Sequence, residues 1–65
     1  MNILINNLPV ELPDDATLDD AVHHAQPRSP FAAAVNKTFV PRTRYGATPL
    51  AEGDRIDLIA PVTGG

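Results

Sequence analysis

The stretch that decides the fold is DDATLDDAVHHAQ, residues 14–26. Leu18, Ala21, Val22 and Ala25 recur in it at positions i, i+3, i+4 and i+7, the spacing that places side chains on one face of an α-helix. A short amphipathic helix has to bury its apolar face against another layer of the same domain. The sequence on either side of the helix is therefore expected to supply a sheet.

The sequence also marks both ends of this helix. Thr17 is the expected N-cap, and Asp20, three residues later, gives the T-x-x-D form of a capping box. The neighbouring aspartates complement the positive end of the helix dipole, and Pro27 ends the helix. Capping and dipole pairing account for these acids, so we do not interpret them as an acid–base pair.

Two short runs before the helix have the character of strands. MNILI (residues 1–5) is apolar, and LPVEL (residues 8–12) alternates apolar side chains with Pro9 and Glu11. Asn6-Asn7 between them tolerates the positive φ of a tight turn. The sequence predicts a β-hairpin, and Pro9 assigns its second strand to an edge of the sheet.

A second hairpin is predicted after the helix. FAAAV (residues 31–35) has the composition of a buried strand, Asn36-Lys37 forms a turn, and TFV (residues 38–40) is a strand that Pro41 ends.

The remainder of the chain is a turn-rich segment followed by one more strand. Leu50 is the one obvious core anchor in residues 41–54. The final strand is RIDLIA (residues 55–60), in which Ile56 and Leu58 share one face.

The order hairpin, helix, hairpin and final strand predicts an α+β fold. A mixed sheet of four to five strands wrapped on one helix buries the helical stripe, with the first and last strands central and parallel. This is the β-grasp arrangement. Residues 1–60 are expected to form the domain and residues 61–65 a flexible C-terminal tail, in which the pair Gly64-Gly65 offers no side chain for packing.

Composition limits the classes of function. The chain has 65 residues, no cysteine and a formal charge of −3, which argue against disulfides, a thiolate metal site and nucleic-acid binding. The adjacent pair His23-His24 lacks the i, i+4 spacing of helical metal ligands, and no P-loop or nucleophile elbow suggests an enzyme. Without an apolar run of membrane length or the basic start of a signal peptide, we expect a cytoplasmic protein that contacts no membrane.

Three segments of the sequence resemble one known family. MNILINN (residues 1–7), AVNKTFVPR (residues 34–42) and LAEGDRIDLIAPVTGG (residues 50–65) are similar to the opening strand, the A-[VI]-N-x-x-x-VPR segment and the Gly-Gly end of the ThiS family. The family comprises ubiquitin-like β-grasp sulfur carrier proteins of thiamine biosynthesis. The three segments occur in the family's order over the whole chain.

The resemblance implies a protein that is a co-substrate and not a catalyst. An adenylyltransferase related to ubiquitin-activating enzymes would adenylate the carboxylate of Gly65 with ATP, while the carrier itself binds no cofactor. A persulfide donor of the cysteine desulfurase type would then supply sulfur, and the thiocarboxylate would deliver it to thiazole synthase. A carboxylate needs this activation because it is a poor electrophile.

The tail would enter the partner's active site. Five extended residues span at most about 17 Å, enough for the body of the domain to remain outside. Val62, Thr63 and Gly64 would thread through the channel, and glycine suits a channel that presses on both faces of the backbone.

The resemblance also implies a partner surface. Alternation aims Leu4 and Ile59 away from the core, so they should sit together on the exposed face, which ubiquitin-like proteins use to dock activating enzymes. Phe39 would widen this surface. Arg42 belongs to a span without acids, residues 21–51, whose basic side chains are also candidates for docking.

Two alternatives remain open. The small subunit of molybdopterin synthase and protein-conjugating modifiers share the same tail chemistry and differ in their partners. A plain β-grasp binding module with an inert tail would not depend on Gly64 and Gly65 at all.

Overall fold

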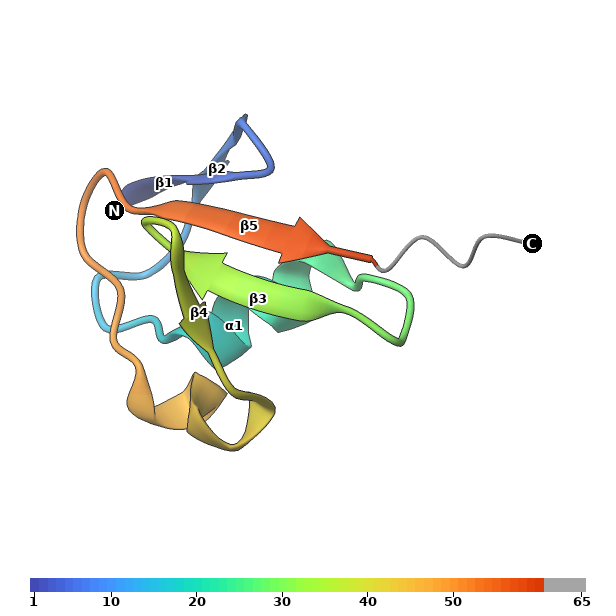
Figure 1. Ribbon diagram of the computed structural model, residues 1–65. Coiled ribbons are helices and arrows are strands. Elements are labelled where there is room, and N and C mark those ends of the chain that lie inside the picture. Colours follow the sequence, from blue (N-terminus) through green and yellow to red (C-terminus); the bar gives the residue numbers. More distant parts are fainter. Residues whose placement is uncertain (61–65) are drawn as a thin grey trace.

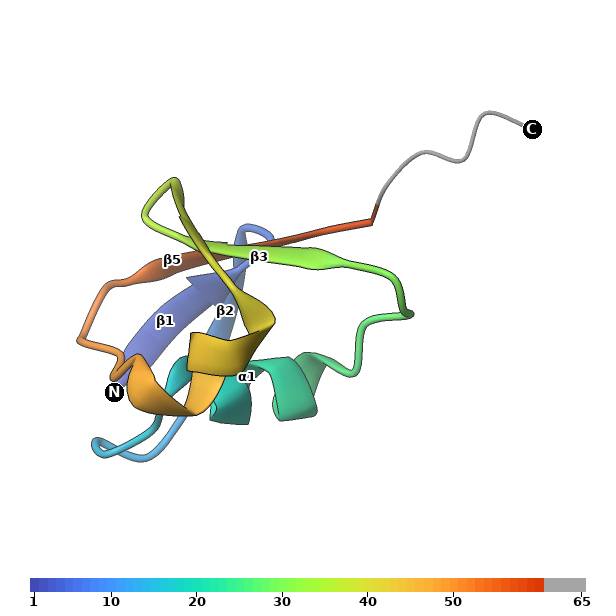
Figure 2. The same cartoon turned by 60° about the horizontal axis from the view of Figure 1, so that its bottom comes forward.

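The computed structural model describes residues 1–60, and the predicted tail, residues 61–65, lies outside the described residues. One five-stranded sheet carries the α-helix α1 (Leu18–Ala25) and the 3-10 helix η1 (Arg42–Ala47) on one of its faces (Figures 1 and 2). Within residues 1–60 no helix covers the other face, which we call the outer face. The strands are β1 (Asn2–Ile5), β2 (Leu8–Glu11), β3 (Ala32–Val35), β4 (Thr38–Val40) and β5 (Arg55–Ile59).

The strand order in the sheet is β2-β1-β5-β3-β4. The two hairpins are antiparallel, and β5 pairs with β1 in parallel and with β3 in antiparallel orientation. This confirms the predicted mixed sheet with the first and last strands in its interior. Pro9 lies in the edge strand β2, where its missing N–H removes no bond from the interior of the sheet.

Both hairpins turn on two residues in the left-handed region of backbone space. The φ angles are 52° and 69° at Asn6 and Asn7, and 50° and 70° at Asn36 and Lys37. Two consecutive positive φ angles are typical of the type I′ turn, whose twist matches that of the flanking strands. The predicted turns are confirmed, and the asparagines explain why the chain reverses there.

The ends of α1 are also as predicted. Thr17 is the N-cap, and its backbone N–H donates to Oδ2 of Asp20 at 2.8 Å. At the other end Gln26 adopts a left-handed conformation with a φ of 49°, directly before Pro27. The helix thus begins and ends through contacts encoded within a few residues.

The core lies between the sheet and the two helices. Ile3, Leu18 and Ile56 are its largest fully buried side chains. Leu50 is buried, as predicted, but the expectation that it is the one anchor in residues 41–54 is wrong, because Tyr45 of η1 is only 7% exposed. A single aromatic residue in a turn-rich segment has no periodic partner that would announce its burial.

Two apolar side chains on the inner side of the fold are more exposed than their pattern suggests. Leu8 in β2 is 67% exposed, and Ala25 at the end of α1 is also exposed. Both line an open groove beside His24. The helix has eight residues, and a helix of that length extends about 12 Å, which leaves this corner of the sheet uncovered.

Candidate functional site

An exposed apolar surface lies on the outer face near the end of β5. Ile59 is 57% exposed and lies opposite Ala32 of β3. Phe39 of β4 is 65% exposed and lies opposite Ala34 of the same strand. We call these four residues the outer patch. The two alanines between Phe39 and Ile59 present little side chain, so both larger residues face solvent. They lie two strand spacings apart across the sheet and two residues apart along it, about 12 Å in all.

The outer patch continues around the end of the sheet. Ile59 and Ala32 line a small hollow together with Pro30 and Phe31, all of them apolar. The hollow lies where β5 gives way to residue 60, the last described residue of the chain. A partner seated on the outer patch would therefore contact the point from which residues 61–65 continue.

Leu4 lies on the outer face as predicted, but not beside Ile59. It pairs with Arg55, four residues before Ile59 along β5, and is half-buried. Four residues of a strand span about 13 Å, and Asp57 points to the same face between them. The prediction that Leu4 and Ile59 sit together is wrong. Alternation determines which face of the sheet a side chain points to, but not which residue of the neighbouring strand it lies beside.

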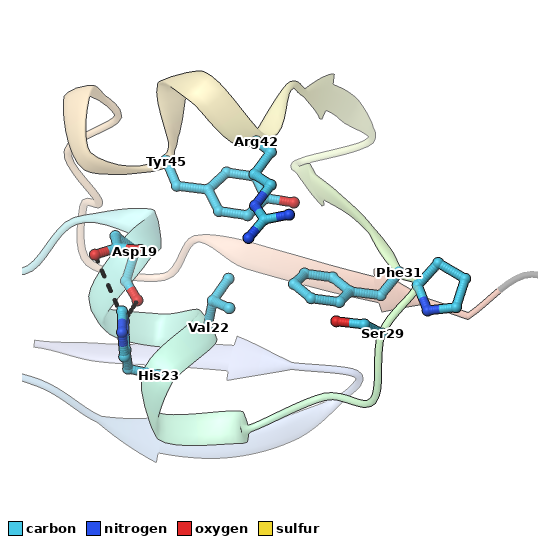
Figure 3. Close-up of a pocket in the computed structure, with 8 residues that line it drawn as sticks. Asp19, Val22, His23, Ser29, Phe31, Arg42 and Tyr45 are labelled. Carbon is cyan, nitrogen blue, oxygen red and sulfur yellow. Dashed lines mark hydrogen bonds and ion pairs between the residues drawn. The ribbon is translucent and has the colours of Figure 1, made fainter.

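The structure does not bring Arg42 to the outer patch. Arg42 begins η1, and its side chain lines a cleft with Val22 of α1 on the opposite side of the sheet (Figure 3). Lys37, from the same span of basic residues, instead lines a groove with Arg55 beside the two hairpin turns. The cations of residues 28–44 are therefore divided between surfaces and form no single basic patch.

Two turn asparagines hold β5 at its two ends. The Leu58 N–H donates to Oδ1 of Asn6 at 2.8 Å, and Nδ2 of Asn6 donates to the Leu58 carbonyl at 3.3 Å. At the beginning of the strand the Arg55 N–H donates to Oδ1 of Asn36 at 3.0 Å. Sequence reasoning assigned both asparagines to turns and missed these contacts, since nothing in the sequence pairs Asn6 with Leu58.

Several predicted site residues fall outside the described part of the chain. These are Val62, Thr63, Gly64 and Gly65. In residues 1–60 no helix is both long and apolar enough to cross a bilayer. The same residues contain no group of three His, Cys, Asp or Glu side chains placed to hold a metal ion.

A five-stranded mixed sheet in the order β2-β1-β5-β3-β4, with one α-helix across its inner face, defines a ubiquitin-like β-grasp protein. The chain belongs to the ThiS family, which it matches over residues 3–65.

Two solved structures of similar fold come from the same organism. The crystal structure of the thiamine biosynthesis protein ThiS from Geobacter metallireducens has a TM-score of 0.82 and 17% identity, with 100% of each chain covered. The NMR solution structure of a thiamine biosynthesis protein from the same organism has a TM-score of 0.77 and 19% identity, covering 100% of this chain and 88% of the other. A comparison with curated proteins gives no match.

Proposed function

We propose that this chain is the sulfur carrier of a thiamine biosynthesis system and carries sulfur on the carboxylate of Gly65. Membership of the ThiS family, matched through residue 65, supports the tail chemistry. The observation that carries the proposal is the outer patch, where Phe39 is exposed and Ile59 is exposed directly before the last described residue. A carrier needs a docking surface close to the group that a partner modifies.

The chemistry proceeds by activation and displacement. An adenylyltransferase joins the Gly65 carboxylate to the AMP portion of ATP and releases pyrophosphate, which gives the carbonyl carbon a leaving group. The terminal sulfur of a persulfide displaces AMP and forms an acyl disulfide. A thiol then cleaves the sulfur–sulfur bond, leaving the thiocarboxylate on the carrier and a disulfide on the donor. Thiazole synthase is the proposed acceptor.

The carrier contributes binding and position to these steps. The outer patch offers apolar area to the adenylyltransferase, and exclusion of water from such an area favours association. The Asn6 contact with Leu58 keeps the end of β5 in the sheet. The tail therefore begins at a defined place relative to the docked surface, and positioning of this kind lowers the entropic part of a reaction barrier.

Intact-mass spectrometry tests the proposal. The full chain is incubated with ATP, the adenylyltransferase, a cysteine desulfurase, cysteine and a thiol reductant. The expected product is heavier by the difference between sulfur and oxygen, with the change mapped to Gly65 by fragmentation. An unmodified carboxylate under these conditions contradicts the carrier function, and it would favour a binding module with an inert tail.

Turnover with thiazole synthase tests the acceptor separately. Loss of the added sulfur from the carrier when thiazole synthase and its other substrates are present supports a role in thiamine biosynthesis. Transfer to a molybdopterin precursor or to a lysine of another protein would assign the same tail chemistry to a different class of carrier.

A further inference from the structure

A cleft on the inner side of the fold has no role in the proposed sulfur transfer. It lies between α1 and η1 and has a volume of about 460 Å³. Val22 and Phe31 form apolar parts of its wall, while Ser29, Arg42 and Tyr45 supply polar groups (Figure 3). The cleft thus combines apolar walls with a few convergent polar groups, as small-molecule sites do.

Tyr45 presents a hydroxyl without a protein partner to this cleft. Tyr45 as a whole is 7% exposed. Its ring stacks on the ring of Phe31, with the ring centroids 6.2 Å apart and the ring planes at 26°. The hydroxyl points into the cleft, and it makes no hydrogen bond to any of residues 1–60 (Figure 3). The hydroxyl oxygen itself is not enclosed, since no buried side-chain polar atom of residues 1–60 lacks a partner. It is open to the cleft, where it can bond water or a ligand atom that displaces the water.

Arg42 supplies a positive charge at the same place. Its side chain lines the same cleft as Tyr45 (Figure 3), and no carboxylate of residues 1–60 lies within ion-pairing distance of its guanidinium. The acid in the cleft wall, Asp19, is turned toward His23, whose Nδ1 lies 3.5 Å from Oδ2 and 2.8 Å from the backbone oxygen of Asp19. Arg42 therefore retains its donors for an anion.

The balance of charge selects the kind of anion. One guanidinium faces the cleft, and Asp19 contributes a negative charge to its wall. A dianion such as phosphate loses more hydration than a monoanion on entering a cleft with apolar walls, because the desolvation cost rises with the square of the charge, and one guanidinium balances only one negative charge. A carboxylate also fits the planar guanidinium, which binds two oxygens at once.

We propose that the cleft between α1 and η1 binds a small organic monocarboxylate whose apolar group packs on Phe31 and Val22. Arg42 donates to the carboxylate oxygens, and the Tyr45 hydroxyl donates a further hydrogen bond to one of them. The site lies on the inner side of the sheet and leaves the outer patch free, so a bound ligand and a docked adenylyltransferase occupy different surfaces. The site does not depend on the proposed sulfur transfer.

A titration of the full, ¹⁵N-labelled chain followed by NMR tests this site. The probe is benzoate, with benzyl alcohol to supply the ring without the charge and inorganic phosphate to supply charge without the ring. Benzoate is expected to give saturable shifts at Val22, Phe31, Arg42 and Tyr45, with a Kd on the order of 1 mM for so small a ligand. Equal affinity for either control compound would overturn the proposal.

Variants assign the binding to the named groups. Arg42→Gln and Tyr45→Phe are each expected to weaken benzoate binding about tenfold, the effect of losing a hydrogen bond to a charged group. Arg44→Gln is the matched control, because it removes the same charge from η1 at a residue that does not line the cleft. If Arg42→Gln and Arg44→Gln bind benzoate equally, the site is wrong. Unchanged thermal unfolding shows that each variant is folded.

Discussion

The carboxamide of Asn6 binds both backbone polar groups of Leu58, 52 residues further along the chain. The last residue of β1, Ile5, pairs with Ile56. The chain turns away after Ile5, so β1 offers no residue to bond the backbone of Leu58 on this side of β5. The Asn6 side chain takes the place of the missing strand. A residue needed for a positive φ in the hairpin turn thereby also extends the sheet toward the tail.

The first prediction separates these two roles of Asn6. Asn6→Gly keeps the freedom to adopt a φ of 52° but removes both contacts with Leu58. We expect the free energy of unfolding to fall by about 1 kcal/mol, since the lost hydrogen bonds are exposed to solvent. Asn7→Gly is the control, because Asn7 has a φ of 69° and no side-chain hydrogen bond within residues 1–60. Equal urea midpoints for the two variants would show that the contact with Leu58 contributes nothing.

A second prediction concerns the outer patch. Ile59→Asp is expected to change the free energy of unfolding by about 0.5 kcal/mol or less, since Ile59 is 57% exposed. Its affinity for the adenylyltransferase should fall about tenfold or more, because an unpaired charge would face an apolar partner surface. Isothermal titration calorimetry measures the affinity.

Leu8→Asp is the control for this experiment. Leu8 is 67% exposed, comparable to Ile59, but lies on the inner side of the edge strand β2. The charge should therefore leave the affinity for the adenylyltransferase unchanged. If both variants bind equally weakly, general surface charge and not the outer patch governs docking.

The third prediction tests why the tail ends in glycine. Gly64→Ala is expected to retain docking through the outer patch, while adenylation slows about tenfold or more because a Cβ displaces the carboxylate from ATP. ATP–pyrophosphate exchange measures the rate. Gly46→Ala is the matched control, because a Cβ at Gly46 meets no atom within 4 Å. Adenylation of Gly64→Ala at the parent rate would refute the idea that the channel of the adenylyltransferase is too narrow for a Cβ at this position.

The fourth prediction concerns the amino group of Met1 in this chain. Its hydrogen bond to Oδ1 of Asp14, at 3.0 Å, raises the pKa of the ammonium above 8.0; burial opposes this effect, and the nearby carboxylates of Glu11 and Glu52 support it. Because the folded pKa exceeds the unfolded one, the stabilisation is complete below pH 8.0 and is lost as the pH rises through the folded pKa.

Urea midpoints measured at increasing pH check this prediction. The decline in stability above pH 8.0 should be smaller in Asp14→Asn than in the parent chain. Asp15→Asn serves as the control, since Asp15 makes no contact with the amino group. The decline should also weaken at high salt, because Asp14 is exposed to solvent. A parent chain and an Asp14→Asn variant with the same pH dependence would rule out the ion pair as its cause.

Much of the fold is encoded locally and could be predicted from the sequence. The turns at Asn6-Asn7 and Asn36-Lys37, the cap at Thr17 and the edge position of Pro9 depend on the conformational preferences of those residues. The burial of Ile3, Ile5 and Ile56 follows from alternation with a period of two. A residue's own chemistry is enough to predict each of these features.

The register between the strands and the contacts between distant segments were decided by the tertiary structure. Alternation predicts that Leu4 and Ile59 face outward, but the pairing of Leu4 with Arg55 separates them, and this register depends on strands about fifty residues apart. The location of Arg42 in the cleft, the burial of Tyr45 and the contact of Asn6 with Leu58 likewise arise where distant segments pack. The sequence by itself determined which residues turn, cap and alternate, because those preferences act over a few residues. The folded chain decided which side chains share a surface, because strand register and helix placement are properties of the whole packed domain.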